Sequence, residues 1–358
     1  MSTAPSQRIP VAVLGATGSV GQRFAGMLAG HPWFTVAFLA ASERSAGKPY
    51  GEAVRWVQPT PLPEELAEMP VMPCSPEALG GCRLAFSALD TAVATETEEA
   101  FAAAGCWVVS NASSHRMHPQ VPLVVPEVNP DHLDLAARQG FGPGRILTNP
   151  NCSTIGLTLA LKPLVDAFGV EACHVVTMQG LSGAGLPGVP GMQVPDNLIP
   201  FIGGEEEKFE SEAAKILGRL DGGEITPYPL AVSAHCNRVP VSDGHTECVS
   251  LKLHRPATPE QVLEAWRSFT GEPQRLELPS APRPVIHYLT QPDAPQPRLH
   301  RDLGGGMAIS VGRLRPCPLL DYRFVTLSHN TIRGAAGGSI LLAELAVARG
   351  LIPGGAGA

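Results

Sequence analysis

The stretch VLGATGSVG, residues 13–21, constrains the fold of this chain more than any other segment. The apolar run IPVAVLG (9–15) predicts a strand directly before the glycines, and SVGQRFAGMLAGHP (19–32) predicts a helix directly after them. Glycines at every third position allow a tight strand-to-helix turn, and they let backbone N–H groups approach a pyrophosphate at the helix N-terminus. This strand-before, helix-after context favours a dinucleotide-binding loop over a purely structural turn.

The rest of the first 150 residues repeats this alternation of strand and helix. Three further stretches, nearly all apolar, predict strands, and an alanine-rich stretch between the last two predicts a helix. The strands are expected at 34–42, 82–89 and 106–112, and the helix at 97–105. Apolar strands separated by helices predict a parallel sheet covered on both faces. Residues 1–150 are therefore interpreted as a Rossmann-like, doubly wound α/β domain.

The pattern changes after residue 150. Longer strands, the first two antiparallel, are expected at 171–179, 245–254, 307–315 and 321–330. A helix is expected at 257–269, where Thr258 as N-cap and Gln261 three residues later form a capping box. Residues 151–335 are therefore predicted to form an α+β domain. The apolar tail, at about 336–358, predicts one helix that packs back on the first domain.

Composition excludes several classes of protein. The 358 residues include 26 Lys and Arg and 33 Asp and Glu, and the net charge of −7 argues against general binding to nucleic acid or a membrane surface. Apolar stretches stay below about 18 residues, so no membrane span is predicted. A strand begins almost at once, which leaves no room for a signal or transit peptide. Eight scattered cysteines without C-x-x-C spacing predict reduced thiols in the cytoplasm and no metal site.

The segment after the second predicted strand, AASERSAGK, bears on the choice of dinucleotide. An acidic residue there favours NAD, whereas arginine and small hydroxyl donors favour the 2′-phosphate of NADP. Glu43 supports the first reading and Ser42, Arg44 and Ser45 support the second; because Ser42 is closest to the strand end, NADP is predicted. The glycine-loop residues expected to contact the cofactor are Gly15, Thr17, Gly18, Ser19, Val20 and Gly21.

The stretch TNPNCSTIG, residues 148–156, places Cys152 directly before the apolar, helix-like segment STIGLTLALKPL. At a helix N-terminus the macrodipole and the free N–H groups stabilise a thiolate and lower the thiol pKa. Cys152 is therefore a candidate nucleophile. The alternative is a buried cysteine that only fills space, which is the role we assign to the other seven cysteines.

A candidate base for this thiol lies in NRVPVSDGHTE, residues 237–247. Arg238 and His245 flank a turn that contains proline and glycine, at the ends of two strands. Such a pair can present a carboxylate-binding guanidinium beside a group that carries a proton near neutral pH. A surface arginine and a solvent-exposed loop histidine remain the alternative interpretation.

Eight motifs, in order along the chain, are together similar to the aspartate-semialdehyde dehydrogenase family and most resemble its archaeal and fungal branch. The similarity runs from about residue 8 to about residue 345 without a large gap. The motifs are GATGSVGQ, SNASSHRM, VPLVVPEVN, NPNCSTIGL, SGAGLPGVPGM, IPFIGGEEEK, RVPVSDGHTE and HNTIRGAAGGS.

The resemblance implies an enzyme that reduces L-aspartyl 4-phosphate to L-aspartate 4-semialdehyde with NADPH and releases phosphate. The pathways it implies lead to lysine and diaminopimelate, threonine, methionine and isoleucine. Cys152 matches the nucleophile that forms a thioester, His245 the acid/base residue, and Gln179 the residue that orients the thioester. Such enzymes are homodimers or homotetramers, with the interface in the catalytic domain, here 151–335.

The resemblance also implies how the substrate charges are bound. Arg238 matches the group that binds the α-carboxylate, and Glu205 the group that binds the α-ammonium, with Glu206 as the alternative. Lys208 and Arg116 match the phosphate site. Further matches are Asn151, a candidate donor to the phosphate or acyl oxygen, and Ser182, Gly183 and Asn330, which match loops near the nicotinamide. Glu207 and Glu210 are expected on a solvated helix face.

Three other functions remain as alternatives. A malonyl-CoA reductase or an N-acetylglutamyl-phosphate reductase would share the scaffold, but neither substrate carries a free α-ammonium. The Glu205 and Lys208 pair therefore favours the aspartyl substrate. A dinucleotide-binding module without activity would be expected to have lost at least one of Cys152, Gln179, Arg238 and His245. The cysteines and histidines lack the spacing of zinc ligands.

Overall fold

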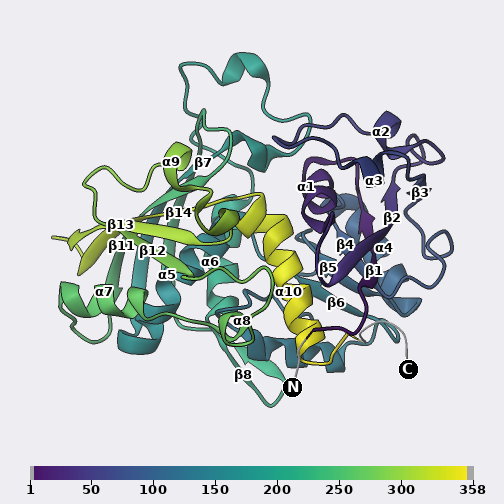
Figure 1. Cartoon of the computed structure of the whole chain (residues 1–358). Coiled ribbons are helices and arrows are strands. Elements are labelled where there is room, and N and C mark those ends of the chain that lie inside the picture. The colour runs from purple at the N-terminus through teal and green to yellow at the C-terminus, as the bar shows by residue number, and fades with distance from the viewer. Residues whose placement is uncertain (1–3, 353–358) are drawn as a thin grey trace.

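The computed structural model describes residues 4–352, and within them the chain forms two six-stranded sheets (Figure 1). In the first sheet every pairing is parallel and the strand order is β3-β2-β1-β4-β5-β6. Its strands are β1 (Ile9–Leu14), β2 (Phe34–Ala41), β3 (Val71–Pro73), β4 (Leu84–Ser87), β5 (Trp107–Ser110) and β6 (Arg145–Thr148). This order is that of a doubly wound dinucleotide-binding fold, so the predicted α/β class is confirmed.

The helices that connect these strands are short. They are α1 (Ser19–Leu28), α2 (Tyr50–Ala53), α3 (Glu64–Ala67), α4 (Thr91–Ala103) and the 3₁₀ segment η1 (Pro130–Arg138). The predicted strands and the helix after the glycine loop are confirmed, with ends shifted by a few residues, whereas β3 and β6 were not predicted. Both are short, three and four residues, which leaves little periodicity to detect.

The second sheet is mixed, with the order β10-β7-β11-β14-β13-β12. The antiparallel pairing of β7 with β11 is confirmed, and β10, which was not predicted, lies parallel beside β7. The strands are β7 (Val170–Gln179), β10 (Ala231–Arg238), β11 (His245–Leu253), β12 (Ile286–Leu289), β13 (Ile309–Pro316) and β14 (Tyr322–Ser328). Helices α5 (Cys152–Phe168), α6 (Glu205–Ile216) and α7 (Pro259–Arg267) pack against this sheet, and α7 begins with the predicted capping box.

Shorter elements complete this half of the chain. They are η2 (Leu181–Ala184), η3 (Gly191–Gln193), β8 (Arg219–Asp221), β9 (Glu224–Thr226), α8 (Glu272–Arg275), α9 (Pro297–His300) and η4 (Leu303–Gly306). None of the helices within residues 4–352 is both long and apolar enough to cross a membrane.

The last helix, α10 (Gly337–Ala348), lies between the two sheets in Figure 1, where it is drawn in yellow. It follows the π-helical turn η5 (Ile332–Ala336), and the side chains from Ile340 to Val347 are buried on every side. The apolar ones among them share one core with strands β1, β2 and β4 of the first sheet. The predicted tail helix thus ends at Ala348, and residues 353–358 of that prediction lie outside the described residues.

Candidate active site

Three predicted site residues lie in one row across the second sheet. Register pairs Arg238, the last residue of β10, with Gln179, the last residue of β7. Gln179 is in turn paired with His245, the first residue of β11. Arg238 and His245 are therefore not on neighbouring strands, as a simple turn between them would suggest, because residues 239–244 cross over the end of β7. Gln179 is therefore the middle residue of the row, between Arg238 and His245.

Cys152 is the first residue of α5, as the sequence predicted. The side-chain oxygen of Asn151 caps the helix by accepting from the backbone N–H groups of Ser153 (3.0 Å) and Thr154 (3.3 Å). The Cys152 Sγ lies 3.2 Å from Nε2 of His245. A thiol and an imidazole within this distance form the pair that nucleophilic catalysis by cysteine requires.

The other ring nitrogen of His245 has a backbone partner. The Gly180 N–H donates to Nδ1 (3.1 Å), and the backbone of Gly244 favours the protonated ring. The same Gly180 N–H also lies 3.2 Å from the Gly244 carbonyl, so it keeps a partner when Nδ1 carries a proton. With Nδ1 as acceptor, the neutral ring carries its proton on Nε2, facing the sulfur; Nε2 can accept a proton from the sulfur when the ring proton is on Nδ1.

Burial shifts both members of this pair toward their neutral forms. Burial, followed by the positive charge of Arg238, lowers the pKa of His245 to about 3. Although Cys152 is partly exposed through the cavity, burial of the thiol, followed by the negative charge of Glu205, raises the thiol pKa above its ordinary value. The expectation of a lowered thiol pKa is wrong, because these effects outweigh Arg116, Arg238 and the backbone N–H of Ser153.

A cavity of about 270 Å³ opens above Cys152. Predicted residues from both halves of the chain line it: Ser19, Val20, Arg116, Asn151, Cys152, Gln179, Ser182, Gly183, Glu205, Lys208, Arg238 and Asn330. His245 is fully buried behind the lining of this cavity, where its Nε2 contacts the Cys152 sulfur. Among residues 4–352, no group of three or more His, Cys, Asp or Glu side chains is placed to hold a metal ion.

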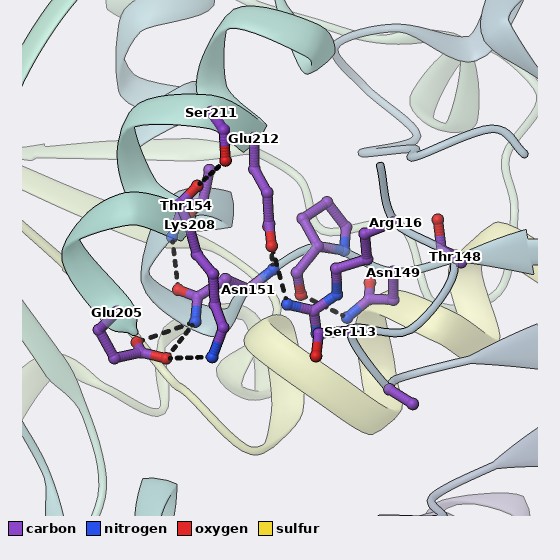
Figure 2. A network of polar contacts seen from close by, with 12 residues as sticks. Ser113, Arg116, Thr148, Asn149, Asn151, Thr154, Glu205, Lys208, Ser211 and Glu212 are labelled. Carbon is purple, nitrogen blue, oxygen red and sulfur yellow. Dashed lines mark hydrogen bonds and ion pairs between the residues drawn. The ribbon is translucent and has the colours of Figure 1, made fainter. Parts of the chain in front are cut away.

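Glu205, the first residue of α6, is the acidic side chain that faces the cavity. Its carboxylate accepts from Nδ2 of Asn151 (3.0 and 2.9 Å) and lies 3.5 Å from Nζ of Lys208 (Figure 2). A weaker bond joins it to Nε2 of Gln179 (3.4 Å). Glu206 instead accepts from the backbone N–H of Cys236 on β10 (2.9 Å), so the geometry favours Glu205 in the choice that the sequence left open.

Arg116 lies on the far side of the cavity from Glu205. Its Nη1 donates to Glu212 of α6 (3.0 Å) and its Nη2 donates to the Asn111 carbonyl (2.7 Å). Its Nε is buried without a hydrogen-bond partner among residues 4–352. Arg116 and Lys208 thus line the same cavity, as predicted for a shared anion site.

A second cavity, of about 640 Å³, runs along the glycine loop. Ser19, Val20, Asn111 and Gly185 line both cavities, so the two adjoin. Gly15, Thr17 and Gly18 line the second cavity as predicted, and no side chain caps the N-terminus of α1 beyond Gly18, which leaves its N–H groups available to a phosphate.

Gly21 does not line this cavity, and a Cβ there would lie only 2.1 Å from the Gly15 carbonyl. Gly21 therefore allows α1 to pack against the loop, and the expectation that it contacts the cofactor is not supported by its position. At the far end of the cavity Ser42 and Arg44 line the wall, whereas Glu43 and Ser45 do not.

The loops predicted near the nicotinamide lie at the junction of the two cavities. Asn330 accepts from the Gly244 N–H (2.8 Å) and donates to the Ser182 hydroxyl (2.8 Å), so it ties η2 to the turn before His245. Gly183 packs so closely that a Cβ would lie 2.8 Å from Nη1 of Arg238.

Comparison with known proteins identifies the family. The family model described as "Semialdehyde dehydrogenase, NAD binding domain" matches residues 10–136, and the one described as "Semialdehyde dehydrogenase, dimerisation domain" matches residues 161–333. The aspartate-semialdehyde dehydrogenase of Methanothermobacter thermautotrophicus is 52% identical over 94% of this chain and 98% of its own length. The chain belongs to the aspartate-semialdehyde dehydrogenase family.

Solved structures of aspartate-semialdehyde dehydrogenases share its fold. The Candida albicans enzyme, determined with NADP, superposes with a TM-score of 0.89 at 46% identity, covering 97% of this chain and 100% of the other. The Vibrio cholerae enzyme II, complexed with ASA, gives a TM-score of 0.77 at 29% identity, covering 96% and 99%. The resemblance stated from the motifs is thus confirmed, and the chain is an oxidoreductase of aspartate-family amino-acid biosynthesis with an NAD-binding and a dimerisation domain.

Sequence reasoning left some residues of this aspartate-semialdehyde dehydrogenase site without a role. Asn111 and Gly334 line the cavity and lie in quoted motifs, SNASSHRM and HNTIRGAAGGS, but were given no function. A Cβ on Gly334 would lie 2.6 Å from that of Cys152, so only glycine lets η5 approach the nucleophile. Glu212 could have been found from one signal. It follows Glu205 by seven residues, a spacing that places both side chains on the same side of a helix.

Proposed function

We propose that this protein reduces L-aspartyl 4-phosphate to L-aspartate 4-semialdehyde with NADPH, through a thioester on Cys152. The observation that carries the proposal is the 3.2 Å contact between Cys152 Sγ and His245 Nε2, beside a cavity into which Arg116, Arg238, Glu205 and Lys208 converge. A substrate with a phosphate, a carboxylate and an ammonium group matches those charges.

Cys152 and His245 carry the covalent step. The sulfur attacks the acyl carbon while its proton moves to Nε2 of His245, and the bond between the acyl carbon and the phosphate oxygen breaks. This transfer requires the ring to hold its own proton on Nδ1, and the backbone of Gly244 supports it because it favours the protonated ring. NADPH, when bound, supplies the hydride that reduces the thioester. His245 returns the proton when the hemithioacetal collapses to the aldehyde and Cys152.

The substrate charges are assigned to the four side chains as follows. The guanidinium of Arg238 binds the α-carboxylate. Its Nη1 donates to the Gly180 carbonyl (2.7 Å), which fixes its position. Glu205 binds the α-ammonium, and Arg116 and Lys208 bind the phosphate. Because Glu205 raises the thiol pKa, binding of an ammonium group to it favours the thiolate. A substrate without an ammonium group, such as malonyl-CoA, would leave the Glu205 carboxylate without a cationic partner on the substrate. Gln179 orients the thioester between Arg238 and His245.

Asn151 is the least direct of the assigned contacts. Its side chain already caps α5 and bonds to Glu205, so a contact with the phosphate or acyl oxygen would have to compete with Glu205 for Nδ2. We keep this contact as a proposal.

The cofactor groove fits NADP. The free N–H groups at the start of α1 face the groove, and Arg44 with Ser42 lines the end where a 2′-phosphate would lie. The NADP in the Candida albicans structure supports the same choice. We assign cofactor binding to residues 1–150 together with α10, and catalysis to 151–335.

We further propose a homodimer or homotetramer that works in the cytoplasm. The match to a dimerisation domain supports the association. So does the face of the second sheet on which alternate residues of β7, β10 and β11 are exposed or half-buried; His174, His235 and Cys248 are among the exposed ones. Size-exclusion chromatography with light scattering, over a range of concentrations, tests this association.

The function is tested by the reverse reaction. L-Aspartate semialdehyde, inorganic phosphate and NADP are expected to give NADPH, read by its absorbance, and omission of phosphate is expected to abolish the signal. No turnover here, together with turnover of malonyl-CoA or N-acetylglutamyl phosphate in the forward direction, would reverse the assignment.

A further inference from the structure

One side of α6 carries four charged side chains, and the proposed function uses only the first two. Glu205, Lys208, Glu212 and Lys215 are spaced three, four and three residues apart, so they lie along one side of the helix. Glu205 and Lys208 line the cavity, whereas Glu212 (2% exposed) and Lys215 (6% exposed) are buried behind it. Buried charges need partners, so the partners of this second pair indicate its role.

Glu212 bridges two parts of the active site that are distant in sequence. Its Oε1 accepts from Nη1 of Arg116 (3.0 Å), and its Oε2 accepts from the backbone N–H of Asn151 (2.6 Å). Asn151 is the N-cap of α5 and directly precedes Cys152. Figure 2 shows the Glu212 carboxylate between Arg116 on one side and Asn151 on the other. One carboxylate thus holds both the guanidinium and the start of the helix that carries the nucleophile.

Lys215, one turn further along, holds the backbone that carries Arg116. Its Nζ donates to the carbonyls of Arg116 (2.6 Å), His118 (3.0 Å) and Val121 (3.0 Å), which uses all three of its protons. The loop and the side chain of Arg116 are therefore both fixed to the same helix, one by Lys215 and the other by Glu212.

This bridge leaves part of the Arg116 guanidinium unoccupied. One proton of Nη1 is taken by Glu212 and one of Nη2 by the Asn111 carbonyl, while Nε is buried without a partner among the residues that the structure describes. Nη1 and Nη2 each keep a second proton, which an oxyanion in the cavity that Arg116 lines can accept.

We propose that Glu212 is a positioning residue, which fixes the Arg116 guanidinium relative to the Cys152 helix so that phosphate is bound beside the nucleophile. The inference rests on the proposed function, in which Arg116 binds phosphate. It differs from a purely electrostatic role. If Glu212 acted only as a negative charge beside Arg116, it would weaken phosphate binding, and removing its charge would tighten that binding. If Glu212 positions Arg116, removing its charge weakens phosphate binding.

The test compares Glu212→Gln with wild type in the reverse reaction, with inorganic phosphate and L-aspartate semialdehyde varied separately. An amide can accept from one of the two donors but not both. The KM for phosphate is therefore expected to rise at least about tenfold, the cost of one charge-assisted hydrogen bond. The KM for the semialdehyde is expected to stay within about twofold. Glu210→Gln is the matched control, because Glu210 is exposed on the same helix and is expected to leave both values unchanged.

A double-substitution experiment shows whether Glu212 acts through Arg116. In an Arg116→Ala background, Glu212→Gln is expected to raise the KM for phosphate no further, since the guanidinium that it positions is gone. If Glu212→Gln does not fold, Glu212→Asp replaces it, and the same rise in the KM for phosphate is expected. The shorter side chain keeps the charge but cannot reach both Arg116 and the Asn151 N–H.

Provided that the wild-type enzyme is active, three results for Glu212→Gln would overturn the inference: a lower KM for phosphate, an equal rise in both KM values, or a loss of thermal stability with unchanged kinetics. Absence of turnover by wild type itself would instead overturn the proposed function, and the inference with it.

Discussion

Glu247, in the middle of β11, is a buried carboxyl group that the proposed reaction does not use. It is 1% exposed, and neither of its oxygens has a hydrogen-bond partner among residues 4–352. Its cross-strand neighbours are Thr177 and Thr326, and it lies beneath α5, where a Cβ on Gly156 would come 3.5 Å from its Oε1. Burial raises the pKa of Glu247 well above its usual range. The folded protein therefore holds this group as a neutral acid.

The consequence is a dependence of stability on pH. Above its pKa in the unfolded chain, about 4.3, the carboxyl binds a proton only in the folded state, so raising the pH favours unfolding. Each pH unit costs about 1.4 kcal/mol until the pH reaches the folded pKa. The loss therefore begins near pH 4.3 and ends at the folded pKa, which burial places well above its usual range.

Glu247→Gln keeps the shape of the side chain and removes the proton equilibrium. We expect the variant to gain stability relative to wild type as the pH rises, by up to about 1.4 kcal/mol per pH unit below the folded pKa of Glu247. Free energies of unfolding in urea, at pH 5.5, 6.5 and 7.5 and at one fixed protein concentration, measure this gain; the concentration is fixed because association shifts apparent stability.

Glu224→Gln, an exposed carboxylate on β9, serves as the control and is expected to show a constant difference from wild type at all three pH values. The reasoning is refuted if Glu247→Gln shows the same constant difference, because Glu247 would then bind protons alike in the folded and unfolded states.

Three further predictions concern the site. Cys152→Ser is expected to bind NADP, measured by fluorescence titration, but to lose turnover by orders of magnitude, because a serine hydroxyl stays protonated near neutral pH; most of the rate surviving would contradict the thioester. Arg44→Glu is expected to raise the Kd of NADP far more than that of NAD, and equal losses would remove the 2′-phosphate assignment. Gly183→Ala would place a Cβ 2.8 Å from Nη1 of Arg238. We expect it to lower kcat/KM at least about tenfold by displacing that guanidinium, and a wild-type value would show that the loop adapts.

The parts of the fold and site that could be predicted are those with a local cause. The glycine loop was recognisable because a strand, a turn and a helix follow one another within some twenty residues. Cys152 was recognisable because an apolar, helix-like segment follows it directly. β10 was missed although Ala234 and Cys236 alternate with exposed residues along it. Small and polar side chains give a weak strand signal compared with β-branched or aromatic ones.

Other features could not be read from the sequence because they depend on distant segments. The row of Arg238, Gln179 and His245 is set by the register of three strands, which no single segment encodes. The raised thiol pKa of Cys152 follows from burial and from Glu205, a residue 53 positions further along the chain. The helix N-terminus, which lowers the thiol pKa, was visible in the sequence. The closeness of the Glu205 charge, which raises that pKa, was not.

The burial of α10 against β1, β2 and β4 makes the cofactor-binding body discontinuous along the chain. Topologically, the second sheet and its helices form an insertion between the sixth strand of that body and its last helix. A fragment that stops near residue 150 would expose the apolar surface that α10 covers. On the ribosome the first sheet is synthesised first, yet it can complete its core only when the final helix emerges, after the inserted body has had time to fold.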